Sequence, residues 1–316
     1  TYAAMGLFSQ VETPAEGISA TAVWGIVAGS FLLSVVIAIV AVIGGVGGGV
    51  LFTPIMMGFT AIDTLIIRST GLVVAMFSGL VASGPFMRRG LADIRLVFYC
   101  AIPIIVGAMT GGRAAIVLSE AMGPEGDALV RLFLGLILIF IAVIFVIGGG
   151  KTEYPEPGHI GKLAQLLQLK ASYHEESLGR NVHYQAVRPL LGFFLFLVVG
   201  FTGGFFGLGG GWAVVPVLNL VMATPLKVSA ASSGVLLAMG NAAAIWEYVI
   251  KGALIAAFAA PWMAGQVVGG ILGAHILSYI KARFVRNILI FLLVLTSLKL
   301  MGRGIETLAG FEIPIF

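Results

Sequence analysis

Charge is what this chain of 316 residues has least of. Aspartate, glutamate, lysine and arginine make up only 10% of it, whereas hydrophobic residues make up 59% and the mean hydropathy is +1.08. A soluble protein of this size carries about a quarter charged residues, so a soluble globular fold is excluded. The sequence therefore predicts an all-α polytopic membrane protein with the lipid bilayer as its surroundings.

Cysteine and histidine are nearly as scarce. The single cysteine, Cys100, excludes disulfides within the chain, iron–sulfur clusters and thiolate zinc sites. Three of the four histidines (His159, His174 and His183) fall in the one hydrophilic stretch, and no metal-ligand spacing or catalytic constellation appears. We therefore expect no cofactor, no metal and no enzymatic activity. Nucleic-acid binding is not expected either, because the basic residues sit mostly in loops that flank apolar segments.

Long apolar runs fill most of the chain and form two sets of five. They cover about 22–43, 46–60, 65–86, 95–118 and 128–148, and then 189–205, 209–222, 228–249, 254–279 and 284–302. The second member of each set has about 14 residues, fewer than the roughly 20 that a helix needs to span a bilayer. It is either a short helix joined to its predecessor or half of a hairpin that re-enters the membrane.

Loop charges predict the orientation of the two sets. Equivalent loops carry opposite charge bias in the two halves, which is the pattern of inverted repeats under the positive-inside rule. The prediction is two inverted-topology repeats of about five helical segments each, with broken short helices at the glycine-rich motifs described next. The divisions are an external segment 1–21, a first repeat 22–148, a cytoplasmic linker 149–188 with an interfacial helix, a second repeat 189–303 and a tail 304–316.

A glycine-rich phrase occurs twice, as GGVGGGVLFTP in 44–54 and as GFFGLGGGWAVVP in 204–216. At a constant offset of 162, the first copy's Gly47, Gly48, Gly49 and Pro54 become Gly209, Gly210, Gly211 and Pro216. Paired breaks of this kind in two halves are the best sequence pointer to a transporter binding site. A helix that starts after the break points unpaired N–H groups at a cavity, which suits an anion. The alternative is that the glycines only let helices pack closely.

Polar side chains follow each glycine motif. Ser69-Thr70 and Ser232-Ser233 occupy equivalent places near the start of the next segment, and Ser78 and Asn241 are equivalent about two turns deeper. Hydroxyl and amide donors suit an oxyanion that accepts many hydrogen bonds, although a serine in a membrane helix more often bonds its own backbone. Arg68 directly precedes Ser69 and either attracts the anion or extends to the membrane interface.

These motifs resemble the TauE/SafE family of sulfite exporter-like permeases. The resemblance rests on GGVGGGVLFTP, on GLGGGWAVVP, on the STG and SSG turns and on the duplicated layout, and it covers about residues 22–303. It implies transport of a small sulfur-containing or carboxylated anion across the bacterial inner membrane, as export driven by the proton gradient. Arg68 is a departure, because the family usually has a small residue there, as Ala231 is in the second half.

The resulting hypothesis is a secondary transporter, an exporter of a small sulfur-containing anion such as sulfite or a sulfonate. It works by alternating access, with the anion held at the N-termini of the broken helices. The alternatives are a passive anion channel and a transporter of a small carboxylate. The candidate binding residues are Gly47, Gly48, Gly49, Arg68, Ser69, Thr70, Gly209, Gly210, Gly211, Ser232, Ser233 and Asn241. Protons are the candidate coupling ion, and a homo-oligomer remains open.

Overall fold

The computed structural model describes residues 20–44, 46–147, 155, 162–175, 179–276 and 282–309. Within these ranges the chain is mostly helical, and seven helices are long and apolar enough to cross a membrane. The expected fold class, an α-helical polytopic membrane protein, is therefore confirmed. Most of the predicted segment 1–21, much of the linker 149–188 and part of the tail 304–316 lie outside the described residues.

All ten predicted segments are present as helical elements. The first half contains α2 (Ala20–Gly44), α3 (Gly49–Phe59), α4 (Thr64–Arg88) and α5 (Ile94–Ile147). The second half contains α7 (Pro189–Phe206), α8 (Val214–Pro216), the π-helical turn η1 (Val217–Val221), α9 (Leu226–Ile250), α10 (Ala256–Ile276) and α11 (Ala282–Ala309). A straight helix with the 54 residues of α5 would be about 80 Å long. Instead, its backbone leaves the helical conformation at Gly123, which gives the two predicted segments.

Aspartates begin two of the long helices. The Asp63 carboxylate accepts hydrogen bonds from the backbone N–H groups of Leu65 and Ile66, at 2.8 and 3.2 Å, and so caps α4. The Asp93 carboxylate does the same at the start of α5, where it accepts from Arg95 and Leu96. A side-chain oxygen at this place satisfies N–H groups that have no partner within the helix.

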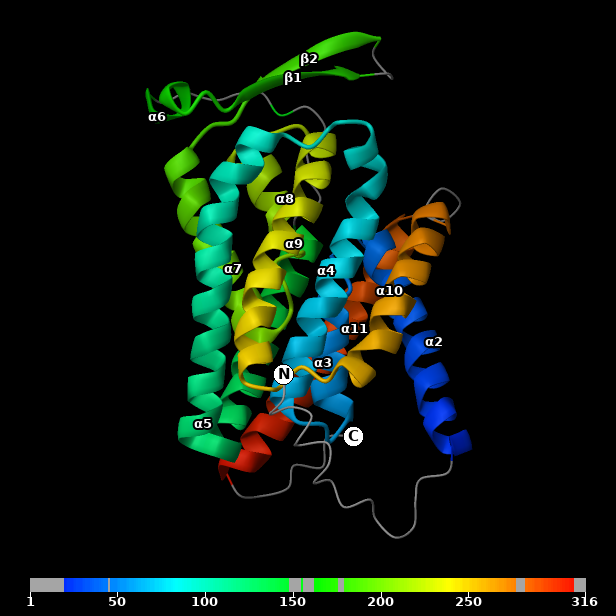
Figure 1. Ribbon diagram of the computed structural model, residues 1–316. Helices are drawn as coiled ribbons and strands as arrows, with labels where there is room; N and C mark the ends of the chain where they lie inside the picture. The colour runs from blue at the N-terminus through cyan, green and yellow to red at the C-terminus, as the bar shows by residue number, and fades with distance from the viewer. Residues whose placement is uncertain are drawn as a thin grey trace.

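The short glycine-rich segments return to the end of the bundle from which they came. The backbone N–H of Val187, just before α7, donates to the carbonyl of Met222, just after η1, at 2.9 Å. In Figure 1, α3 lies in the part of the bundle nearer the opposite end and α8 in the part nearer the β-strands. The structure thus favours re-entrant hairpins, α2–α3 and α7–α8–η1, which approach each other from opposite ends.

Each hairpin packs against a helix of the other half. A β-carbon added at Gly269 in α10 would touch the carbonyl of Val35 in α2, and one added at Gly107 in α5 would touch the carbonyl of Leu197 in α7. Val35 and Leu197 are 162 residues apart, and so are Gly107 and Gly269. These contacts, together with the central pair α4 and α9, support the predicted repeat. The inversion of the second copy stays a prediction.

Replacing Gly200 with leucine is expected to force α7 away from α5. A β-carbon at this position would lie 3.0 Å from the backbone nitrogen of Ala108, and rigid backbone cannot move aside as a side chain can. Overpacking of this kind costs about 1–3 kcal/mol, so the midpoint of thermal unfolding in detergent should fall. Gly29→Leu in α2 is the matched control, since nothing lies within 4 Å of its β-carbon position. Equal midpoints for the two variants would contradict this packing.

The linker differs from its prediction. The expected interfacial helix is present only as α6 (Lys162–Leu166), and most of the following residues form an antiparallel hairpin of β1 (Lys170–Glu175) and β2 (Arg180–Gln185). Aromatic residues and a valine, such as Tyr173 opposite Val182, favour extended strands over a helix. The two strands form the cap at the top of the bundle in Figure 1.

Charges divide between the two ends of the bundle. The end that carries the β-hairpin has the basic residues Arg88, Arg89, Arg95, Lys170, Arg180 and Lys227. At the opposite end, acidic residues are common, and three basic side chains there are engaged. Arg303 donates to the carbonyls of Met57 and Thr60 at the end of α3, Lys251 pairs with Glu120, and the Lys299 ammonium lies 4.8 Å from the centroid of the Phe59 ring. By the positive-inside rule, the hairpin end is predicted to face the cytoplasm.

Candidate functional site between the two glycine turns

The two glycine motifs turn the chain in the same way. Gly47 has a φ of +80° and Gly209 a φ of +66°. Left-handed backbone conformations of this kind are open to glycine and strained for most other residues. The equivalent glycines of the two repeats therefore adopt equivalent conformations, and each lies in the turn between the inbound helix of its hairpin and the returning segment.

The two turns also touch each other. A β-carbon added at Gly211 would lie 2.7 Å from the carbonyl oxygen of Val46, and one added at Gly47 would lie 3.7 Å from the α-carbon of Gly211. In addition, the Thr53 hydroxyl of α3 donates to the carbonyl of Gly207 at the end of α7, at 2.8 Å. The two copies of the glycine motif, which are related by an offset of 162 residues, thus meet inside the bundle.

A cavity of about 130 Å³ lies at this contact. Its lining comes from α2, α4, α9 and both glycine turns, and comprises Ala41, Val42, Gly47, Ser78, Gly79, Ala82, Ser83, Gly211, Val215, Ala230, Ser233 and Leu237. None of these described lining residues is charged. On α4 and α9 the lining belongs to the parts nearer the β-hairpin, so the cavity lies on the hairpin side of the contact between the turns. Its volume is sufficient for several water molecules or one small solute.

Hydrogen-bond donors around this cavity lack acceptors. Ser78 accepts from the backbone N–H of Gly48 at 2.8 Å, and its own hydroxyl proton has no acceptor among the described residues. The amide nitrogen of Asn241 is buried against Gly209 and has no hydrogen-bond partner. In the described part of the chain, the backbone N–H groups of Gly211 and Trp212 also donate to nothing. Unpartnered donors at and beside an uncharged cavity favour an anionic or strongly polar guest.

A second buried amide, Gln266, was not predicted. Its side chain is fully buried in α10 and donates to the carbonyl and hydroxyl of Ser34 at 3.2 and 3.1 Å, while its oxygen has no hydrogen-bond partner. A β-carbon at Gly48 would collide with this amide. The sequence does mark Gln266, because this polar residue interrupts the apolar segment 254–279. The sequence does not indicate that Gln266 contacts Ser34 in the hairpin of the other half.

The predicted hydroxyl residues divide into two groups. Ser233 lines the cavity, and Thr70 is fully buried with an unpartnered hydroxyl. Ser69 instead donates to the carbonyl of Ala253, just before α10, at 3.0 Å. Ser232 accepts from the backbone N–H of Asp93, just before α5, at 3.2 Å. Ser69 and Ser232 thus each bond the backbone just before a neighbouring helix, α10 and α5 respectively, at opposite ends of the bundle. Neither serine lines the cavity.

Glycines other than Gly47 and Gly211 stand just behind the cavity wall. Gly48 lies against Gln266, and a β-carbon at Gly49 would lie 2.5 Å from the carbonyl oxygen of Leu208. Gly209 contacts Asn241, and a β-carbon at Gly210 would lie 3.0 Å from the Val199 side chain. Each of these positions requires close approach of neighbouring atoms, so the motif serves packing and the turn geometry at once.

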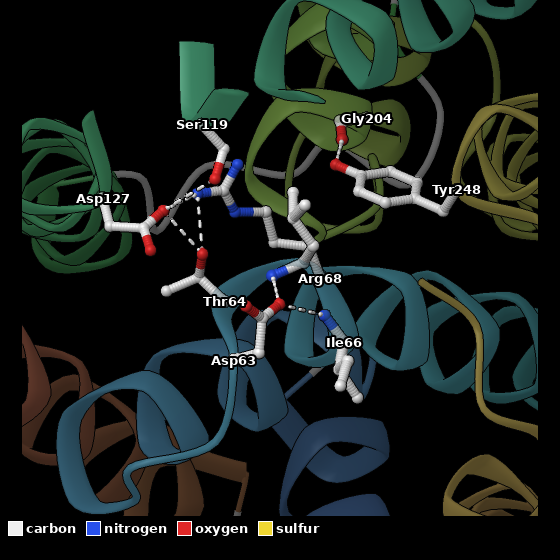
Figure 2. Close-up of polar contacts among 9 residues, drawn as sticks. Asp63, Thr64, Ile66, Arg68, Ser119, Asp127, Gly204 and Tyr248 are labelled. Atoms are coloured by element: carbon white, nitrogen blue, oxygen red, sulfur yellow. Dashed lines mark hydrogen bonds and ion pairs between the residues drawn. The ribbon is translucent and has the colours of Figure 1, made fainter. Parts of the chain in front are cut away.

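Arg68 lies apart from the cavity. It is fully buried on α4, about 15 Å along the helix from Ser78. Its guanidinium forms an ion pair of 3.3 Å with Asp127 in the second segment of α5 and a hydrogen bond of 3.4 Å with Thr64. The Asp127 carboxylate also accepts hydrogen bonds from the hydroxyls of Thr64 and Ser119, at 2.7 and 3.3 Å (Figure 2). Two guanidinium nitrogens, Nε and Nη1, have no hydrogen-bond partner.

Comparison with known proteins agrees with this architecture. The family model described as "Sulfite exporter TauE/SafE" matches residues 30–300, which include both hairpins and the cavity. The chain belongs to the TauE/SafE family. The chain is also similar to the "Probable membrane transporter protein YunE" of Bacillus subtilis (strain 168). The two sequences are 24% identical over 289 residues, which cover 87% of this chain and 99% of YunE. No solved structure matches significantly.

Membership of the TauE/SafE family confirms the resemblance read from the glycine motifs. It gives the chain a role in membrane transport rather than enzymatic catalysis, and it identifies the protein as a multi-pass inner-membrane transporter. Transport implies a small-molecule substrate, and the apolar helix surfaces imply a lipid environment. The cavity between the glycine turns is the candidate place for that substrate.

Proposed function

We propose that this protein is a secondary transporter that exports a small sulfur-containing anion, such as sulfite or a sulfonate, by alternating access. The observation that carries the proposal is the contact between the two glycine turns at an uncharged cavity. Ser78 and Gly211 line this cavity, and the amide nitrogen of Asn241, buried beside Gly209 of the second turn, has no hydrogen-bond partner. Backbone dipoles and hydroxyls bind an anion and still let it leave, whereas a buried lysine would hold it more strongly.

The position of the cavity supports an inward-facing conformation. It lies on the hairpin side of the turn contact, which is the predicted cytoplasmic side. Toward the other end, buried bonds close the bundle: Thr53 to Gly207 at 2.8 Å and Tyr248 to Gly204 at 2.9 Å. Export would require these bonds to open and the cavity to be sealed on its hairpin side, where Ser83 of α4 already donates to the Ala230 carbonyl of α9 at 2.8 Å.

The proton is the coupling ion that we propose. None of the described residues that line the cavity titrates in the physiological range. A proton must therefore travel with the anion itself or through a group outside the cavity. Both routes make the accumulated anion gradient depend on the pH difference across the membrane, which a passive channel would not do for an anion of fixed charge.

Transport of sulfite, sulfoacetate and a short carboxylate by the purified protein in liposomes tests the proposal. We expect flux of one sulfur-containing anion to saturate with concentration and to become uphill when a pH gradient is imposed. Flux that rises linearly and never runs uphill would indicate a channel. Preference for the carboxylate would change the substrate class but keep the site.

Ser78→Ala identifies the site within the same assay. Loss of one hydrogen bond to a charged ligand costs about 1.5–3 kcal/mol, which corresponds to roughly a 10- to 100-fold weaker apparent affinity. Thr110→Val is the matched control, because the Thr110 hydroxyl bonds only carbonyls of its own helix, at 2.8 and 3.0 Å. Equal affinities for the two variants would move the anion away from this cavity.

A further inference from the structure

Two adjoining cavities lie beneath the β-hairpin, at the end of the bundle that is predicted to face the cytoplasm. Their volumes are about 370 and 300 Å³, and they share Gly90, Leu91, Ser172 and Tyr173 as walls. They thus lie between the loop that joins α4 to α5 and strand β1. Neither the transport cavity nor the family motifs account for them.

Positive charge dominates these two cavities. Arg95 and Lys170 line the larger one, and Arg89 and Lys227 line the smaller one. Asp93 is the one acidic residue among the described lining residues. A concave surface lined by charges of one sign focuses the electrostatic potential and raises the local concentration of oppositely charged solutes.

The Asp93 carboxylate already accepts hydrogen bonds from other groups of the protein. Its carboxylate accepts from the Tyr184 hydroxyl of β2 at 2.6 Å and from the backbone N–H groups of Arg95 and Leu96 at the start of α5. Burial and the bond to Asp93 raise the pKa of Tyr184, so this phenol stays protonated and keeps donating throughout the physiological pH range. The one carboxylate among the described lining residues is thereby used to hold the hairpin in place, and the larger cavity keeps the positive charges of Arg95 and Lys170.

The larger of these cavities is one helical turn from the transport cavity. Val228 of α9 lines the larger cavity under the hairpin, and Ala230 and Ser233 of the same helix line the cavity at the glycine turns. Between them, Ser232 accepts a hydrogen bond from the backbone of Asp93. A solute beneath the hairpin is therefore next to the α9 segment that forms the wall of the transport cavity.

We propose that these joined cavities form an anion-collecting vestibule, in which Arg95 and Lys170 draw the transported anion from the cytoplasm toward the cavity at the glycine turns. The inference rests on the proposed function and deepens it. The vestibule acts on capture, so it raises the apparent affinity on the cytoplasmic side and leaves the maximal rate unchanged. Its effect is electrostatic and falls as ionic strength rises.

The test is the uptake of radiolabelled sulfite into inside-out membrane vesicles, which expose the cytoplasmic face. Wild type is compared with the double variant Arg95→Gln/Lys170→Gln. Both side chains are exposed, so the fold should tolerate the change. We expect the KM to rise about tenfold at low salt, with the maximal rate unchanged, and the difference to shrink as salt is added. The matched control is Arg180→Gln, an exposed charge at the same end but outside both cavities.

Two results are decisive in opposite ways. If the double variant has the same KM as Arg180→Gln, the vestibule is overturned while saturable sulfite transport, and with it the proposed function, stands. If wild type itself transports none of the sulfur-containing anions, the proposed function fails and the vestibule fails with it. Right-side-out vesicles add a check, since uptake from the external face should have the same KM in wild type and in the double variant.

Discussion

Replacing Asp127 with asparagine is expected to lower the free energy of unfolding by about 3 kcal/mol. Arg68 is fully buried, and Asp127 is the anion that neutralises it, at 3.3 Å. Removing one partner of a buried ion pair costs about 3–5 kcal/mol, because the other charge is left uncompensated. The lower end applies here, since the Asp127 side chain is 22% exposed and retains some contact with solvent. The measurement is equilibrium unfolding of the purified protein in detergent.

A second variant separates the charge from the packing. In Arg68→Met/Asp127→Leu both charges are gone, and exchanging a buried pair for apolar residues of similar size is often neutral or stabilising. We expect this double variant to recover most of the stability that Asp127→Asn loses. If the double variant is as unstable as the single one, the loss arises from packing around Thr64 and Ser119, and the ion pair is not its cause.

Gly211→Leu is expected to reduce transport to roughly one hundredth of the wild-type rate or less. A side chain at Gly211 meets the carbonyl of Val46 and the α-carbon of Gly47, so the two turns must separate to admit it. Leucine would also project into the 130 Å³ cavity that Gly211 lines. A misplacement of about 1 Å in a site of fixed geometry can cost about 10²-fold in rate.

The matched control for Gly211→Leu is Gly84→Leu. Gly84 lies in α4 with nothing within 4 Å of its β-carbon position, so the same added volume meets no neighbour. Both variants should reach the membrane, and their transport rates are compared per molecule of folded protein. Near-normal transport by Gly211→Leu would show that the turns do not need to touch, and the binding site would have to lie elsewhere.

Periodic and compositional features of the sequence predicted the fold well. Each apolar segment corresponds to a helix, because a span must satisfy its backbone internally and therefore leaves a continuous apolar run. The linker was harder. Its β-hairpin pairs Tyr173 with Val182 in a short hydrophilic stretch, where leucines at Leu163 and Leu166 suggested a longer helix. Composition alone does not decide between strand and helix over so few residues.

The site was predicted in part. The repeat at an offset of 162 singled out both glycine turns, Gly47–Gly49 and Gly209–Gly211, and the structure brings Gly47 next to Gly211. Binding of an anion at these turns stays a prediction. Sequence could not reveal that Asp127 neutralises Arg68, because nothing local to either residue indicates a partner 59 positions away. Nor could it distinguish Ser233, which lines the cavity, from its neighbour Ser232, which holds the backbone of Asp93. Successive residues of a helix face different directions, and that choice depends on tertiary packing.

Each hairpin packs against a helix of the other half, and this has a consequence for how the protein folds during synthesis. The face of α2 that carries Val35 is covered by α10, which leaves the ribosome only after most of the chain has been synthesised. The first hairpin must therefore wait in the lipid without its partner, and the first half cannot mature by itself. The two halves, produced as separate chains in the same cell, should reconstitute one transporter, while either half alone should be degraded.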